Sequence, residues 1–143
     1  RSRPRARWQP HPPAQLAPLD LNGAEPYGAL RPQDLTRKER LDAWSCTRCG
    51  RCSAACPALD GEASGCEGGA LDPLGIVQSL ADAGTAIPLA VQAGEGALWE
   101  CTTCLACVEV CPVGISPLDM IVDLRRERVL DAAVFPVAAA DVF

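Results

Sequence analysis

The stretch Cys46-Thr47-Arg48-Cys49-Gly50-Arg51-Cys52-Ser53-Ala54-Ala55-Cys56-Pro57 has the pattern C-x2-C-x2-C-x3-C-P. The pattern returns as Cys101-Thr102-Thr103-Cys104-Leu105-Ala106-Cys107-Val108-Glu109-Val110-Cys111-Pro112. Such runs hold iron–sulfur cubanes in bacterial-type ferredoxins, where the fourth cysteine of each run ligates the other cluster. We therefore expect two [4Fe-4S] clusters. The expected ligands are Cys46, Cys49, Cys52 and Cys111 for cluster 1, and Cys101, Cys104, Cys107 and Cys56 for cluster 2.

The spacing within each run suits a cubane. Cysteines three positions apart on a tight loop can place three sulfurs on neighbouring iron atoms, and the intervening backbone N–H groups can point at those sulfurs. The proline after the fourth cysteine fixes φ and turns the chain away, toward the neighbouring cluster. Because neither half completes its cluster alone, we expect cluster assembly and folding to be coupled.

Two other uses of the cysteines are weighed against this one. A structural zinc site needs four ligands, whereas each run here already carries four. A secreted disulfide framework is disfavoured because the chain has nine cysteines and no signal peptide. The ninth, Cys66, lies in a glycine-rich segment outside both runs. We interpret it as a free thiol, with a substitute ligand or a redox thiol as the alternative.

Composition limits the partners and the chemistry. The net charge of -5 disfavours nucleic acid as a partner. The sequence also contains no run of 18 apolar residues, the length that a membrane-spanning helix needs. Aromatic residues make up only 4% of the chain, so clusters would supply stability that a small core does not. We find no catalytic histidine, nucleotide loop or paired carboxylate in the sequence, and therefore predict no substrate-converting site.

Cap signals predict the helices. Thr36 and Glu39 form a capping-box pattern before a helix at about 37–44. Asp72-Pro73 and Ser116-Pro117 are each an N-cap followed by proline at the first helical position. The buried faces are predicted to include Leu74, Val77 and Ala81 in the first of these two helices, and Leu118, Ile121, Val122 and Val129 in the second. Arg125, Arg126 and Arg128 are interpreted as a solvated face.

The segments between these signals complete the domain plan. Residues 1–33 are a basic, proline-rich arm, either solvated or following an upstream membrane helix; residues 34–131 form the dicluster domain; residues 132–143 are a tail or a linker. The runs are separated by 44 residues that contain a helix and almost no strand pattern. This predicts an all-α fold, an α-helical ferredoxin with two helical hairpins around two clusters.

Residues from Glu25-Pro26-Tyr27-Gly28 to about Asp131 resemble a known family. Beyond the cysteine runs, the similarity lies in Asp34-Leu35-Thr36-Arg37-Lys38 and Leu41-Asp42-Ala43. The chain is similar to the dicluster segment of heterodisulfide reductase-related iron–sulfur oxidoreductases, including membrane-bound proteins that pass electrons between an electron-transferring flavoprotein and quinone. The second half of succinate dehydrogenase iron–sulfur subunits and the glycolate oxidase iron–sulfur subunit are also similar.

The resemblance implies an electron-transfer module inside a larger oxidoreductase. Its partners would be a flavoprotein donor and a quinone- or heterodisulfide-type acceptor domain, with a membrane domain in the parent chain and a location at the cytoplasmic face of the membrane. The alternative is a soluble iron–sulfur subunit of a glycolate or glycerol-3-phosphate type of dehydrogenase. A zinc-binding interaction module is the third possibility.

Charges beside the two runs suggest an order of potentials. Arg48 and Arg51 lie within the first run, whereas Glu100 and Glu109 flank or enter the second. Because a positive neighbour favours the reduced cluster, we expect cluster 1 to have the higher potential. The tryptophans that precede each run, Trp44 and Trp99, are expected to pack over the clusters or in the core.

Overall fold

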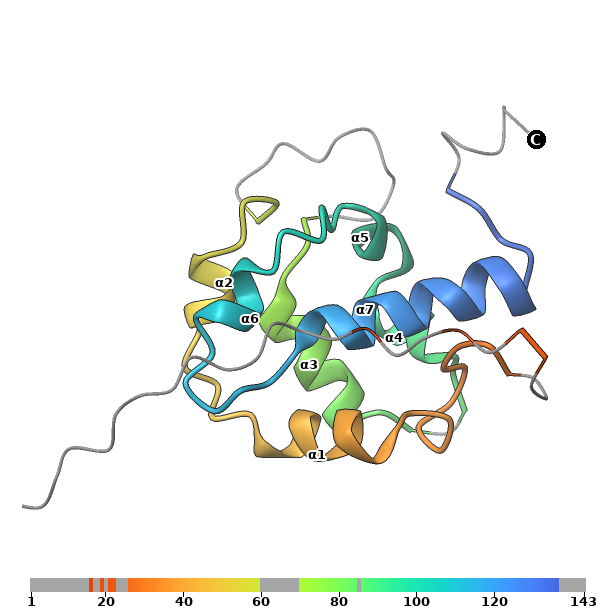
Figure 1. Ribbon diagram of the computed structural model, residues 1–143, viewed down its shortest axis with the longest axis horizontal. Helices are drawn as coiled ribbons and strands as arrows, with labels where there is room; N and C mark the ends of the chain where they lie inside the picture. Colours follow the sequence, from red (N-terminus) through yellow and green to blue (C-terminus); the bar gives the residue numbers. More distant parts are fainter. Residues whose placement is uncertain are drawn as a thin grey trace, which may run out of the picture.

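The computed structural model describes residues 16, 19, 21–22, 26–59, 70–84 and 86–136. These residues form an all-α fold in which no strand occurs (Figure 1). Most of the arm, the segment with Cys66 and the end of the tail lie outside the described residues. The elements are α1 (Arg37–Ser45), α2 (Arg51–Ala54), α3 (Pro73–Ala81), α4 (Leu89–Ala93), α5 (Glu95–Trp99), α6 (Ala106–Glu109), α7 (Pro117–Arg126) and the π-helical turn η1 (Glu127–Asp131).

The three predicted helix starts are confirmed. At α1 the Thr36 side chain accepts from the Glu39 backbone N–H, and Glu39 Oε2 accepts from Thr36 N at 2.8 Å, which completes a capping box. The side chains of Asp72 and Ser116 cap α3 and α7 by accepting from the backbone N–H groups of Leu74 and Asp119, and each cap precedes a proline. The residue types at the caps therefore fix where these helices begin.

The predicted buried faces are only partly right. In α3 the buried side chains are Pro73, Ile76, Val77 and Leu80. In α7 they are Pro117, Leu118, Met120, Ile121 and Leu124, whereas Val122 and Val129 are half-buried. The difference has a physical cause: α7 crosses the middle of the fold and contacts α3, α4, α5 and α6, so it buries more than one face (Figure 1).

Residues 27–30, which precede α1, contact η1 and the start of α4. The Asp131 carboxylate accepts from Tyr27 N at 3.1 Å and from Gly28 N at 3.2 Å, and Leu30 O accepts from Leu89 N at 2.9 Å. A Cβ on Gly28 would lie 2.2 Å from Glu127 N, closer than any real contact. The domain boundary at residue 34 stays a prediction, but this part of the arm contacts the helical core.

Candidate metal centres

Eight cysteines line two neighbouring cavities. The first cavity, cavity 1, is lined by Cys46, Cys49, Cys52 and Cys111, together with Cys107. The second, cavity 2, is lined by Cys101, Cys104, Cys107 and Cys56. Each therefore contains three cysteines of one run and the fourth cysteine of the other. Cys107 borders both cavities, so the two sites are adjacent.

The donor set suits a multi-atom cluster. Three thiols of one run and the fourth thiol of the other run border each cavity, which is the ligand number of a cubane. All eight cysteines are free thiols. Among the residues that the structure describes, no group of three or more Cys, His, Asp or Glu side chains is placed to hold a single metal ion. The donor set therefore fits a cubane.

The two ligand loops repeat the same backbone conformation 55 residues apart. Arg48 and Thr103 have φ of 54° and 57°, and Gly50 and Leu105 have φ of 74° and 66°. Each second left-handed residue begins a four-residue helix, α2 or α6. Left-handed residues within a turn let successive N–H groups point to one side, which makes an anion-binding concavity. Unlike glycine, Leu105 carries a Cβ, so its positive φ costs about 1 kcal/mol or more. Contacts with the surrounding residues must therefore stabilise this loop conformation.

Apolar side chains form the remaining walls. Leu74, Val77, Val113 and Ile115 line cavity 1, and Leu71, Leu105, Leu118 and Ile121 line cavity 2. The predicted face of α3 with Leu74 and Val77 thus borders cavity 1. These walls restrict water around the sites, which is one of the levers on cluster potential.

The thiols differ in their electrostatic surroundings. The backbone N–H of Arg51 lowers the pKa of the exposed Cys49 thiol, as expected for an amide that stabilises a thiolate. Burial raises the pKa of Cys52, and burial raises that of Cys107 to about 12, with the neighbouring thiols adding to the effect. Binding of a positive ion beside Cys107 would favour its thiolate form.

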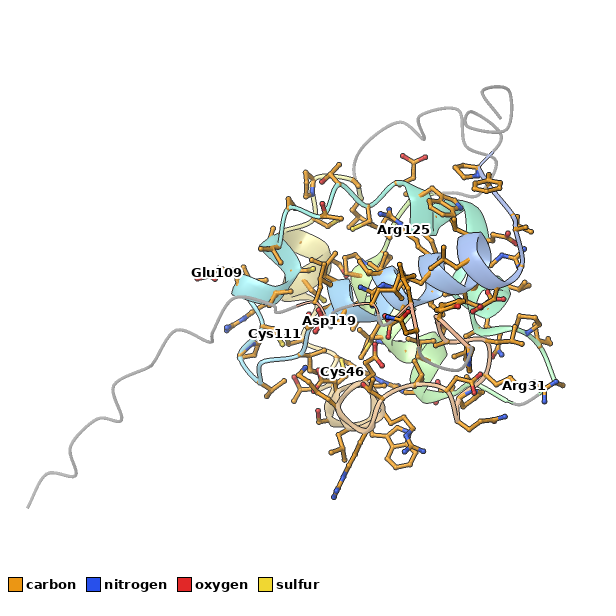
Figure 2. The ribbon with its side chains drawn as sticks, turned by 45° about the vertical axis from the view of Figure 1, so that its right-hand side comes forward. Arg31, Cys46, Glu109, Cys111, Asp119 and Arg125 are labelled. Atoms are coloured by element: carbon orange, nitrogen blue, oxygen red, sulfur yellow. The ribbon has the colours of Figure 1, made fainter. Side chains whose placement is uncertain are left out.

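Arg125 is a site residue that sequence reasoning missed. Its Nε donates to Leu98 O at 2.9 Å, and its Nη2 donates to Cys101 O at 2.8 Å, so it binds the backbone of a predicted ligand directly. The guanidinium also lies 5.3 Å from the centre of the Trp99 ring, within cation–π range. Burial lowers the pKa of Arg125, and the Cys101 thiol opposes that shift. Arg125 thus joins α7 to the start of the cavity 2 loop (Figure 2).

The prediction that the arginines of α7 and η1 form a solvated face is therefore wrong. Besides Arg125, Arg128 is mostly buried and pairs with Glu95 at 2.7 Å, and Arg126 pairs with Asp123 at 3.0 Å. The sequence shows only that these arginines have helical spacing. It does not show their partners, because Leu98 and Cys101, for example, precede Arg125 by 27 and 24 residues.

The prediction that the tryptophans pack over the clusters is also wrong. Neither Trp44 nor Trp99 is among the residues that line the two cavities. Trp99 is half-buried beneath Arg125, whereas Trp44 is 73% exposed. The repeated Trp-x-Cys-Thr pattern therefore occupies two different environments.

The charges behind the predicted order of potentials differ in their exposure to water. Arg48 is 63% exposed and lies 3.9 Å from Asp82, and Glu109 is exposed and points away from the fold (Figure 2). Water screens both of these charges. Half-buried Arg125 lies beside cavity 2, and Asp42 accepts from Ser116 N at 3.4 Å next to the wall of cavity 1. Glu100, which precedes Cys101, is half-buried and has one buried carboxylate oxygen, so water screens its charge less. The order of the two potentials stays a prediction.

Comparison with known families identifies this arrangement. The 4Fe-4S dicluster domain family matches residues 38–112, just over half of the chain and including all eight paired-run cysteines. The chain belongs to the 4Fe-4S dicluster domain family. The cofactors are accordingly two [4Fe-4S] clusters, and the family gives no support to a zinc-binding module.

Several curated proteins share this segment. A probable membrane-anchored ferredoxin of Chromohalobacter salexigens is 36% identical over 89% of this chain and 22% of its own length. An EtfAB:quinone oxidoreductase of Syntrophomonas wolfei is 29% identical over 83% of this chain and 21% of its length. One subunit of a CoB-CoM heterodisulfide reductase of Methanosarcina acetivorans is 34% identical over 71% of this chain and 56% of its length. The chain thus spans about a fifth of the first two relatives. No solved structure matches.

Proposed function

We propose that this chain is the electron-relay segment of a larger oxidoreductase linked to a flavoprotein, a quinone or a heterodisulfide. The observation that carries the proposal is the pair of adjacent thiol-lined cavities that share Cys107 at their border. When bound, each cluster stores and releases one electron. Two sites placed side by side suit passage of an electron through the chain rather than conversion of a substrate within it.

The ligand assignment belongs to the same proposal. Cys46, Cys49, Cys52 and Cys111 would hold cluster 1, and Cys101, Cys104, Cys107 and Cys56 would hold cluster 2. The lining of the cavities supports this assignment, because the fourth cysteine of each run borders the other run's cavity. Ile115 N, 3.3 Å from the Cys111 sulfur, supports it further as a donor to a ligand thiolate.

The remaining protein groups prepare the sites. The loops with positive φ aim amides at the sulfurs, the leucines and valines of α3 and α7 exclude water, and Arg125 fixes the backbone at Cys101. These are the means by which a protein sets the potential of such a cluster.

The partners and the location are inferred from the relatives. One relative is named as membrane-anchored and another as an EtfAB:quinone oxidoreductase, so a flavoprotein donor, a quinone- or heterodisulfide-type acceptor and a position at the cytoplasmic face of a membrane fit the proposal. Within the described part of the chain, no helix is long and apolar enough to cross a bilayer. Membrane attachment would then come from another segment or another protein of the complex.

Iron and acid-labile sulfide analysis of anaerobically purified chain tests the proposal. We expect about eight iron and eight sulfide atoms per chain from two cubanes. Reduction should give the EPR spectrum of two nearby one-electron centres that interact magnetically. A colourless protein, or iron that no mild reductant can reduce, would contradict the relay function.

A further inference from the structure

One face of α1 is exposed, apolar and basic. Arg37, Arg40, Leu41 and Trp44 fall within about 100° of one another around the helix, and all four are exposed. Leu41 is 54% exposed and Trp44 is 73% exposed. Burial of Ala43 and of Glu39 attaches the helix to the core by other positions, so the exposed tryptophan has no part in packing α1.

This face leads directly to the edge of cavity 1. α1 ends at Ser45, and the loop beyond it carries Cys46 and the exposed Cys49. Arg48 and Arg51, in and after that loop, are also exposed. The α1 docking surface is defined here as Arg37, Arg40, Leu41, Trp44, Arg48 and Arg51. The nearby acidic residues are Asp82, which lies 3.9 Å from Arg48, Asp42, which pairs with Lys38 on a neighbouring face of α1, and exposed Glu109, which borders the same surface hollow as Arg51.

The described residues of the second half lack such a surface. At the 55-residue spacing that relates the ligand loops, Glu95 takes the place of Arg40, Thr103 that of Arg48, and Ala106 that of Arg51. Trp99 is covered by Arg125, whereas its counterpart Trp44 is bare. Among the residues that the structure describes, the basic and aromatic surface therefore occurs on the cluster 1 side alone, and the repeated loop architecture does not require it.

We propose that the α1 docking surface binds an acidic face of the protein that exchanges electrons with cluster 1. The proposal rests on the relay function above. Tryptophan and arginine are the residues that contribute most at protein interfaces, and four exposed arginines on a chain of net charge -5 select and steer an acidic partner. Contact here brings the partner to the exposed Cys49, where cluster 1 is nearest to solvent.

An anionic membrane is a less suitable occupant. A helix that lies in a lipid interface presents a broad apolar face. α1 offers only Leu41 and Trp44 on this side over nine residues. Two further arginines of the surface, Arg48 and Arg51, lie beyond the helix beside cavity 1, and membrane binding would not need them.

Stopped-flow electron exchange with flavodoxin tests the proposal, because flavodoxin is an acidic one-electron flavoprotein and serves as the probe. The chain carries both clusters, and the rate is followed in the direction that is downhill. Arg40→Glu should lower the second-order rate constant by about threefold or more at low ionic strength, and the difference should shrink as salt is added. Trp44→Ala should slow exchange at both ionic strengths.

Arg31→Glu is the matched control, because it changes the net charge equally at an exposed position far from Cys46 and Cys111 in Figure 2. It should leave the rate nearly unchanged. Equal effects of Arg40→Glu and Arg31→Glu, with normal iron content and normal exchange with methyl viologen, would overturn the docking surface and leave the relay standing. A cluster-loaded chain inert to methyl viologen as well would contradict both.

Vesicle flotation separates the membrane alternative. We expect the cluster-loaded chain to stay unbound on vesicles of phosphatidylglycerol and phosphatidylcholine. Binding that Trp44→Ala abolishes, together with a flavodoxin rate insensitive to Arg40→Glu, would assign the surface to lipid and overturn the proposal.

Discussion

Replacement of Arg125 tests how the fold sets the potential of cluster 2. The guanidinium donates to Cys101 O at 2.8 Å and is half-buried, so water screens its charge less than that of Arg48 or Arg51. For scale, a unit charge about 8 Å from a redox centre at an effective dielectric of 20 contributes about 2 kcal/mol, or roughly 90 mV for one electron. Arg125→Met should therefore lower the midpoint potential of cluster 2 by several tens of millivolts.

The same substitution should also reduce stability. It leaves Leu98 O and Cys101 O without their charged donor. Each such hydrogen bond contributes about 1.5 kcal/mol or more, so we expect a loss of about 3 kcal/mol in the free energy of unfolding. Arg125→Lys separates the two effects, because it keeps the charge but cannot form the two-pronged contact. Arg125→Lys should leave the midpoint potential of cluster 2 close to the wild-type value and should lower the free energy of unfolding by less than Arg125→Met does.

EPR-monitored redox titration measures the potentials. The signal altered by Cys104→Ser identifies cluster 2, and the other signal serves as the internal reference. The account predicts that Arg125→Met moves the cluster 2 midpoint downward and moves the cluster 1 midpoint much less. Two midpoints that stay unchanged, or that fall equally, would refute the argument that Arg125 acts locally through its charge.

Three further substitutions test other parts of the structure. Gly28→Ala should lower the free energy of unfolding by about 2 kcal/mol or more, because a Cβ at this position would meet the backbone of η1. Gly84 has open space around it, so Gly84→Ala should be nearly neutral and serves as the control. Denaturant titration of the cluster-loaded chains measures both effects. Glu39→Gln should gain stability relative to wild type as pH rises above 4.5. Burial raises the pKa of folded Glu39 above that value, so the folded wild type resists the ionisation that the unfolded chain undergoes, and urea unfolding between pH 5 and pH 8 measures the difference. Cys66→Ala should keep about eight iron atoms per chain, and a lower count by chemical analysis would make Cys66 a ligand.

Local signals in the sequence predicted much of this fold. A cap side chain acts on amides two or three residues away, so Thr36, Asp72 and Ser116 marked the helix starts correctly. The pattern of the cysteine runs predicts two ligand sets that each draw on both runs, and the linings of the two cavities are consistent with those sets. In these cases the partners are close in sequence or belong to a strict pattern.

The sequence could not indicate contacts between distant segments. Arg125 has the helical spacing and the composition of an exposed residue, and only the packing of α7 against α5 brings it to Leu98 and Cys101. The same reason applies to the tryptophans. Trp44 and Trp99 have matching neighbours in sequence, and their exposures differ because only Trp99 has Arg125 above it.

The exchange of the fourth cysteine between the runs is the claim that supports all others, and iron counts in two double variants test it most directly. Cys49→Ala with Cys111→Ala should damage only cluster 1 and leave about four iron atoms per chain, with the cluster 2 EPR signal intact. Cys49→Ala with Cys56→Ala should damage both clusters and leave few or none. The reverse result, with iron retained in the second variant and lost in the first, would mean that each run keeps its own fourth cysteine.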